Sequence, residues 1–310
     1  SPQQFNVTAY GATAVAIVTL ETLAGMWINT FIVCVLCITW VKKKTLNSNE
    51  KILLLLGCSR IGSICMSWVY YVISIIFPKF LHVLPTELLL VSFRTVFNYS
   101  DLWVSACLCI FYCVKIANFR TKFFIYLKVK IDGIVPWLLL GSVIFSLVIG
   151  ILVYDVADNP HCNNSIVPGN LWEVNVKIDS HFFSFYFING LGIFTSFTAG
   201  ISSALLLLFS LWRHKRTMQT NSMNSLSMDA HIKAMKSILS FLVMYSINIV
   251  SFIVTIIYPT KKGNPKMFLI YVFLYAFPGV HSLILIFSNP KLVKTLLRTL
   301  QCVKCKVCMK

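Results

Sequence analysis

Seven long apolar runs dominate the sequence and restrict what this chain can fold into. They lie near 10–41, 50–77, 82–115, 131–154, 181–212, 233–258 and 267–289. A segment that crosses a bilayer as a helix needs about 20 mostly apolar residues. Only helices and closed barrels satisfy every backbone group inside lipid, and runs of this length favour helices. The sequence therefore predicts an all-α integral membrane protein, a seven-transmembrane helix bundle that forms a single domain over residues 1–310.

The charged residues indicate how the bundle is oriented. The chain is 57% hydrophobic and only 12% charged, whereas soluble domains carry about a quarter charged residues. The net charge of +17 is not spread evenly, because most Lys and Arg residues fall in 42–51, 115–130, 213–236 and 291–310. These stretches alternate between spans, so the positive-inside rule makes them cytoplasmic and the N-terminus extracellular. We therefore expect the lipid bilayer as a partner, no nucleic acid, and a cytoplasmic tail at 290–310.

Seven helices suit a receptor, a transporter or a membrane enzyme. Transporters commonly carry internal repeats and paired broken helices, and the sequence shows no convincing repeat. It has ten acidic residues and lacks the HExxH, GxSxG and GxxxxGK[ST] motifs. We therefore expect a receptor and not an enzyme, with no catalytic residue, metal site or cofactor. A small-solute transporter is the alternative from another class.

Several motifs point to one receptor family. In chain order they are ETLAGMWINTFI, LLLLGCSRI, FYCVKIANF, LFSLWRHKRTMQ, AHIKAMKSILSFLVMY and HSLILIFSNPKL. Together they resemble the bitter taste receptors, a family of G-protein-coupled receptors. The vomeronasal type 1 receptors, another chemosensory family, match these motifs less well. The resemblance implies a plasma-membrane, multi-pass receptor for small bitter compounds. It further implies a gustducin-like heterotrimeric G protein of the Gi class as partner, and it allows receptor oligomers.

The resemblance also implies an outer ligand pocket. Asn98 matches the family's pocket asparagine by its distance from FYCVKIANF. The other expected ligand-binding residues are Tyr71, Arg94, Tyr186, Asn248, Phe252, Tyr271 and Tyr275. Arg94, Asn98 and Asp101 are spaced i, i+4, i+7 and share one helix face. Arg94 predicts some preference for ligands with an acidic or strongly accepting group, because a guanidinium pairs bidentately with a carboxylate or a sulfate. Its alternatives are to extend toward the outer interface or to pair with Glu87.

A second group of polar residues lies deeper in the spans. Ionisable groups inside a membrane cost about 2.5–3.5 kcal/mol on insertion scales and usually face the bundle interior. At 1.5 Å per residue, Asn29, Arg60 and Asp101 fall at similar depths, with Glu21 one to two turns higher. We expect an intramembrane polar network centred on Arg60, whose charge Asp101 or Glu21 offsets. The alternative for Glu21 is a protonated, hydrogen-bonded side chain.

The basic residues at the cytoplasmic ends have two interpretations. A lysine such as Lys115 at the end of a span can simply extend into the lipid headgroup layer. The family resemblance instead implies that Lys115, His214, His231 and Lys236 surround the cavity that receives the G protein.

Modification sites and the tail complete the predictions. Asn6 and Asn163 begin Asn-x-Ser/Thr sequences on the expected outer side and are candidate glycosylation sites. KLVKTLLRTL, after Pro290, predicts a short amphipathic helix at the membrane surface. The sequence CVKCKVC comes after this helix, and its residues Cys302, Cys305 and Cys308 are candidates for palmitoylation. A zinc site is the rival interpretation, but the tail has no fourth ligand.

Overall fold

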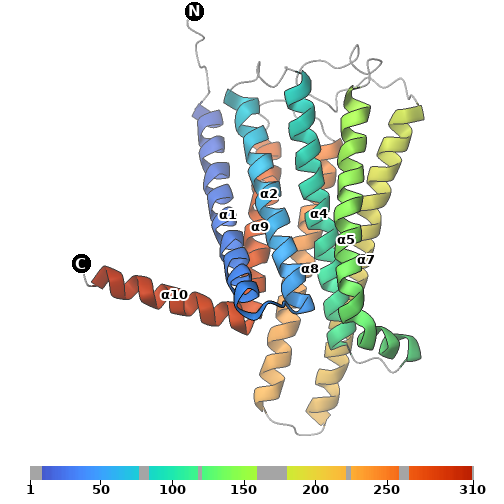
Figure 1. The fold of residues 1–310 in the computed structure, drawn as a ribbon, viewed down its shortest axis with the longest axis vertical. Coiled ribbons are helices and arrows are strands. Elements are labelled where there is room, and N and C mark those ends of the chain that lie inside the picture. The colour runs from blue at the N-terminus through green and yellow to red at the C-terminus, as the bar shows by residue number, and fades with distance from the viewer. Residues whose placement is uncertain are drawn as a thin grey trace, which may run out of the picture.

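The computed structural model describes residues 9–76, 84–117, 121–158, 180–220, 225–257 and 265–308, and their secondary structure is helical. The helices are α1 (Ala9–Lys43), α2 (Ser48–Ile76), α4 (Leu84–Ile116), α5 (Lys122–Asp158), α7 (Ser180–Thr220), α8 (Ser225–Ile257), α9 (Pro265–Ser288) and α10 (Pro290–Cys308). Helices α1 to α9 stand side by side, and α10 lies crosswise at one end of the bundle (Figure 1). We call this the α10 end, and the opposite end, where α1 begins, the far end.

The helices are apolar enough to cross a membrane. Within the described residues, six meet the length and hydropathy expected of a membrane span, and α8 contributes a shorter apolar stretch at Ile238–Ser251. Large apolar side chains point outward from the bundle, including Trp27, Val129 and Trp137, which are 81%, 75% and 74% exposed. Such a surface is favourable against lipid and rare on soluble monomers. The chain is therefore a multi-pass membrane protein.

At the α10 end of the bundle, helices α1, α2 and α10 have capping interactions that fix where they end or begin. Lys44 has a φ of 56°, and its N–H bonds to the Trp40 carbonyl, which closes α1 with a left-handed residue. Glu50 reaches back to accept from the Asn47 N–H at 3.1 Å, as in a capping box at the start of α2. At α10, the Asn289 side chain accepts from the Lys291 N–H at 3.0 Å. These caps fix where the α1–α2 and α9–α10 connections turn.

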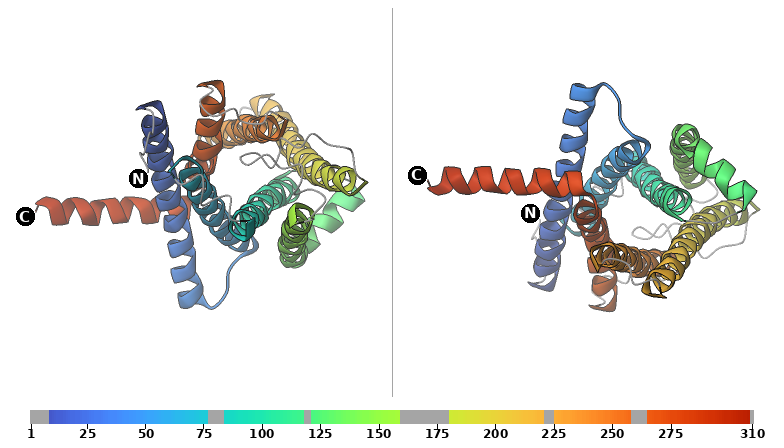
Figure 2. Two further views of the ribbon diagram at one scale, coloured as in Figure 1. Left: turned by 90° about the horizontal axis from the view of Figure 1, so that it is seen from above. Right: turned by 90° about the horizontal axis from the view of Figure 1, so that it is seen from below.

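Helix α4 is the most buried of the candidate spans. It packs against α2, α5 and α7, while α1 packs against α2 and α9, and α8 packs against α7 and α9. Figure 2 looks along the bundle and shows α4 between α2 and α5. Side chains on the inward face of α4 can therefore meet several other helices, and this places the polar residues of α4 at the centre of the molecule.

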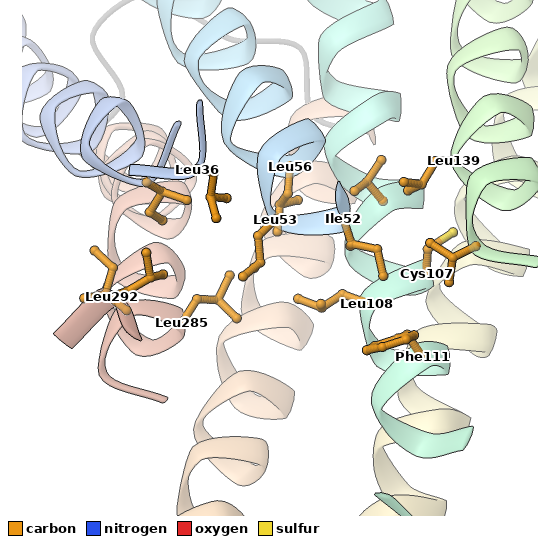
Figure 3. Packing of buried hydrophobic residues seen from close by; sticks show 14 of the residues in the cluster. Leu36, Ile52, Leu53, Leu56, Cys107, Leu108, Phe111, Leu139, Leu285 and Leu292 are labelled. Atoms are coloured by element: carbon orange, nitrogen blue, oxygen red, sulfur yellow. The ribbon is translucent and has the colours of Figure 1, made fainter. Parts of the chain in front are cut away.

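Two apolar clusters lie on either side of this central region. One lies at the α10 end and includes Leu36, Leu53, Leu108 and Leu285 (Figure 3). Leu292 of α10 is fully buried in the same cluster, which anchors the crosswise helix to the bundle. The second cluster joins α4, α5, α7, α8 and α9 through residues such as Tyr99, Ile149, Phe241 and Tyr245.

Several helices continue beyond the apolar runs that the sequence marks. α5 begins at Lys122 instead of near 131, and α7 continues to Thr220 past 212. The amphipathic helix expected over KLVKTLLRTL is likewise longer, since α10 extends through the tail to Cys308. Apolarity marks the part of a helix that faces lipid. A helix does not end where it leaves the membrane, since its backbone hydrogen bonds continue in water.

Candidate functional site

A cavity of about 80 Å³ lies among α2, α4, α8 and α9. Aromatic and aliphatic side chains form most of its wall, with a few polar groups among them. It is lined by Ser63, Ile64, Ser67, Arg94, Asn98, Tyr99, Asp101, Leu102, Ser105, Tyr245, Asn248, Ile249, Tyr271, Leu274, Tyr275, Phe277 and Pro278. An apolar concavity with a small number of polar groups is the usual form of a small-molecule site.

Five of the residues predicted for a ligand pocket line this cavity: Arg94, Asn98, Asn248, Tyr271 and Tyr275. Tyr71 is not among the lining residues. Its ring instead packs behind the wall, with centroids 5.8 Å from the Tyr271 ring and 6.0 Å from the Tyr275 ring. The side chains of Tyr186 and Phe252 lie outside the described residues.

The polar groups of the wall tie α4 and α9 to α2. The Asn98 carboxamide oxygen accepts a hydrogen bond from the Ser63 hydroxyl. On α9, the Tyr275 hydroxyl donates to the Ser67 carbonyl at 2.7 Å. The Arg94 guanidinium lies over the Tyr70 ring, 5.3 Å from its centroid, a geometry that attracts a cation to the aromatic face. These contacts hold the wall in one arrangement.

Below the cavity, toward the α10 end, Arg60 is fully buried in a polar network. Its Nε donates to Asp101 Oδ1 at 2.9 Å, and Nη1 donates to Ser282 Oγ at 2.8 Å. Nη2 lies 3.4 Å from Ser105 Oγ and 2.5 Å from His281 Nδ1. A guanidinium only donates, so Nδ1 accepts and the ring proton of the neutral imidazole is on Nε2. The network thus connects α2 with α4 and α9.

The network continues into α1. Ser282 donates to Asn29 Oδ1 at 2.7 Å, and Asn29 Nδ2 donates to the Gly25 carbonyl at 2.8 Å. Helices α1 and α9 approach closely here, at Gly25 and Gly279. A Cβ added to Gly279 would lie only 3.2 Å from the Gly25 Cα. Small residues at such crossings let helix backbones come together in membranes.

Glu21, the fourth residue predicted for this network, is not joined to it by any contact between described residues. Its Oε2 is buried and has no hydrogen-bond partner there. The carboxylate beside Arg60 is that of Asp101, whose side chain is 11% exposed. A fully buried guanidinium needs such a partner, since an unpaired buried charge is strongly destabilising.

At the α10 end, Lys115 lies beside α5. Its Nζ bonds to Asp132 Oδ2 at 2.6 Å, and the two side chains are 45% and 55% exposed. His214, His231 and Lys236 belong to α7 and α8, but their side chains lie outside the described residues. The same is true of Cys302, Cys305 and Cys308 in α10, whereas Asn6 and Asn163 lie wholly outside them.

The sequence reasoning did not single out the serines and the tyrosine that complete these sites. Ser105 and Ser282 bond to Arg60, Ser59 bonds to Ser100 at 2.7 Å, and Tyr245 lines the cavity. One signal was available, because Ser105 follows Asp101 by four residues and so shares its helix face. Serine and tyrosine are common in apolar helices, however, so this spacing is weak evidence without the neighbouring helices.

Comparisons with known proteins place this architecture in a family. The seven-helix receptor fold is shared with squid rhodopsin, whose crystal structure superposes with a TM-score of 0.63 at 14% identity and covers 94% of this chain and 85% of that one. Taste receptor type 2 member 9 of Papio hamadryas is 32% identical over 294 residues, 92% of each chain. Taste receptor type 2 member 14 of Homo sapiens is 32% identical over 283 residues, 88% of this chain and 86% of its own length. The family model described as Taste receptor protein (TAS2R) matches residues 7–304, and the chain therefore belongs to the taste receptor protein family.

Proposed function

We propose that this chain is a bitter taste receptor that binds small bitter compounds in the cavity among α2, α4, α8 and α9. The observation that carries the proposal is the cavity itself, an aromatic wall with a few polar groups that adjoins the buried Arg60 network through Asp101 and Ser105. Because the chain belongs to the taste receptor protein family, the two alternatives, a vomeronasal type 1 receptor and a solute transporter, are not favoured.

The proposed orientation puts the far end outside the cell and the α10 end in the cytoplasm of a plasma-membrane receptor. Lys42, Lys43 and Lys44 at the end of α1 and Lys291 and Lys294 in α10 support it, because cytoplasmic loops are enriched in Lys and Arg. In this orientation Asn163 is a glycosylation site on the outer side. The tail cysteines lie in the last turns of the amphipathic helix α10, and this position beside the membrane favours their palmitoylation.

Within the cavity, each of the five predicted ligand-binding residues that line it has a proposed role. Asn98 and Asn248 are the neutral hydrogen-bonding groups, and Arg94 binds the acidic group of a ligand. Tyr271 and Tyr275 supply the aromatic wall. This division matches small-molecule sites in general, where apolar surface gives affinity and a few polar groups fix the orientation.

Activation requires that the ligand bind one helix arrangement more tightly than another. The Arg60 network bridges α1, α2, α4 and α9, so a ligand that shifts α4 or α9 changes its contacts. We propose that the resulting movement opens the α10 end to a heterotrimeric G protein of the gustducin-like Gi class. Lys115, His214, His231 and Lys236 are the residues that face this partner.

The test is intracellular calcium in cells that express the receptor with a gustducin-chimeric G protein and are exposed to a bitter-compound panel. We expect responses to some compounds, loss of response in Asn98→Ala, and normal surface expression of both proteins. The matched control is Gln301→Ala, an amide substitution at an exposed position of α10, away from the cavity. Silence across the panel at normal surface expression would contradict the proposal.

A further inference from the structure

Two segments lie crosswise at the α10 end of the bundle, α10 itself and the first turns of α5 (Figure 1). Seen along the bundle, they lead outward in different directions (Figure 2). In α5 the change of direction has a local cause, because Pro136 lies inside the helix and a proline there bends it. Pro136 has no N–H for the Asp132 carbonyl, which the Ser48 hydroxyl contacts instead at 3.5 Å. We call residues 122–130 the outward α5 segment.

Neighbouring residues place the outward α5 segment at the membrane boundary. Its Phe124 packs in a small apolar cluster with Leu207 and Leu211 of α7. The next residue of α7, Trp212, is 49% exposed, and basic residues follow it. Tryptophan is enriched where hydrocarbon meets water, so an apolar run that ends in tryptophan and basic residues marks this boundary. The segment therefore lies beside the lipid headgroups and not beside the centre of the bilayer.

The outward α5 segment exposes apolar and basic side chains together. Phe123, Tyr126 and Val129 are 72%, 62% and 75% exposed. Lys122, Tyr126 and Lys130 recur every four residues, so they share one helix face. A lysine within the hydrocarbon is costly, whereas at its edge the apolar stem lies along the lipid and the ammonium group reaches the headgroups. This face therefore suits a membrane surface better than water or hydrocarbon alone.

The positive charge of the segment is not offset by neighbouring carboxylates. The segment contains three lysines and no acidic residue. Among the described side chains, the carboxylates at the α10 end are those of Glu50 and Asp132, which pair with Lys291 and Lys115. The lysines of the segment thus keep their charge beside the membrane. Such a surface is complementary to anionic headgroups.

The direction of the segment favours lipid over a protein as its partner. A protein that enters the α10 end between the helices meets inward side chains, whereas this segment leads away from the bundle (Figure 2). Lipid surrounds every membrane-spanning helix, so it is what an outward segment at the boundary meets.

We propose that the outward α5 segment binds anionic phospholipids of the leaflet at the α10 end, with headgroups at Lys122 and Lys130 and the apolar side chains among the acyl chains. A basic side chain near an anionic membrane surface contributes about fivefold in affinity. A phosphatidylcholine headgroup has no net charge and gains less at these lysines. This site concerns the membrane alone and depends neither on the compounds that the receptor binds nor on its G protein.

The probes are dioctanoyl-phosphatidylserine and dioctanoyl-phosphatidylcholine, short-chain lipids that differ in the net charge of the headgroup. Their affinities are measured by thermal shift of the full chain purified in an uncharged detergent. We expect phosphatidylserine to bind at least about fivefold more tightly. The preference should shrink when KCl is raised from about 50 mM to about 500 mM, because salt screens exposed charges.

Paired variants test whether the charge of this segment is responsible. Lys122→Gln with Lys130→Gln should lower the affinity for phosphatidylserine at least about fivefold and leave that for phosphatidylcholine unchanged. Both lysines are exposed, so the melting temperature without lipid should not change. Lys122→Arg with Lys130→Arg keeps the charge and the preference. The matched control is Lys42→Gln with Lys43→Gln, the same charge change at exposed lysines in the last turn of α1, which should leave the preference unchanged.

Equal affinities for the two lipids, an unchanged preference in the glutamine variant of α5, or the same loss in the α1 control would each overturn the proposal. Calcium responses of the same variants are recorded in cells. A glutamine variant of α5 that keeps its lipid preference but loses its calcium response would also overturn the proposal, and would identify the segment as a protein-docking surface instead.

Discussion

Arg60 of α2 and Asp101 of α4 form an ion pair at 2.9 Å, in which the arginine side chain is fully buried. Their elements are joined again by Ser59 and Ser100, whose hydroxyls lie 2.7 Å apart. Because Arg60 also bonds to Ser282 of α9, the pair lies where three helices meet. Its removal should therefore affect the bundle as a whole and not only one contact.

Arg60→Leu is expected to lower stability and surface expression severely. It leaves the Asp101 carboxylate buried and unpaired, and breaking a buried pair costs about 3–5 kcal/mol. The double variant Arg60→Leu with Asp101→Leu should recover part of the loss, because it removes both charges. Melting temperature in detergent and surface labelling measure both effects, with Arg298→Leu in exposed α10 as control. Normal folding and signalling of Arg60→Leu would show that the network is dispensable.

His281 is expected to act as a neutral acceptor for Arg60. In His281→Asn the side-chain oxygen can replace Nδ1, whereas His281→Leu offers no acceptor. Both variants lose the ring contacts to Phe241 and Phe277, so the difference between them reports the hydrogen bond. We expect His281→Asn to be more stable than His281→Leu by about 1–3 kcal/mol. Equal melting temperatures would argue that packing alone explains this histidine.

Gly150 of α5 is expected to be intolerant of a larger residue. A Cβ there would overlap Val96 Cγ2 of α4 and lie 3.3 Å from the Ser92 carbonyl oxygen. Valine is stiff about χ1 and yields poorly, so Gly150→Ala should cost about 1–3 kcal/mol. Gly141→Ala on the same helix is the matched control, because nothing lies within 4 Å of its added Cβ. Adding Val96→Ala to Gly150→Ala should restore stability if the overlap is the cause.

The pair of Lys115 and Asp132 should contribute little to stability. Both side chains are about half exposed, and exposed ion pairs are worth about 0–1 kcal/mol. Asp132→Asn is therefore expected to shift the melting temperature only slightly. Under the proposed function, a larger effect on G-protein activation is expected, because the substitution releases Lys115 from α5. The charge-swapped variant, Lys115→Asp with Asp132→Lys, tests whether the pairing itself matters, and a large loss of stability in Asp132→Asn would contradict this account.

The sequence by itself determined the class of the molecule. Apolar runs long enough to span a bilayer require helices, since lipid offers no partner for exposed backbone groups. Basic residues between the runs predict an orientation, and the order of motifs such as FYCVKIANF predicts the family, which the comparisons confirm. Arg60 could also be recognised as interior from sequence, because a guanidinium facing lipid is too costly.

Only the tertiary structure decided which side chains meet. Counting residues along a span gives depth, so Asp101 and Glu21 were both candidates to offset Arg60. The choice depends on how α1 and α4 are rotated about their axes, and this rotation is fixed by packing against other helices. For the same reason the sequence did not reveal Tyr245 as a residue that lines the cavity, because this depends on how α8 is placed in the bundle. The helix ends were also not predicted, because α5 and α7 continue beyond their apolar runs for as long as their backbone hydrogen bonds persist.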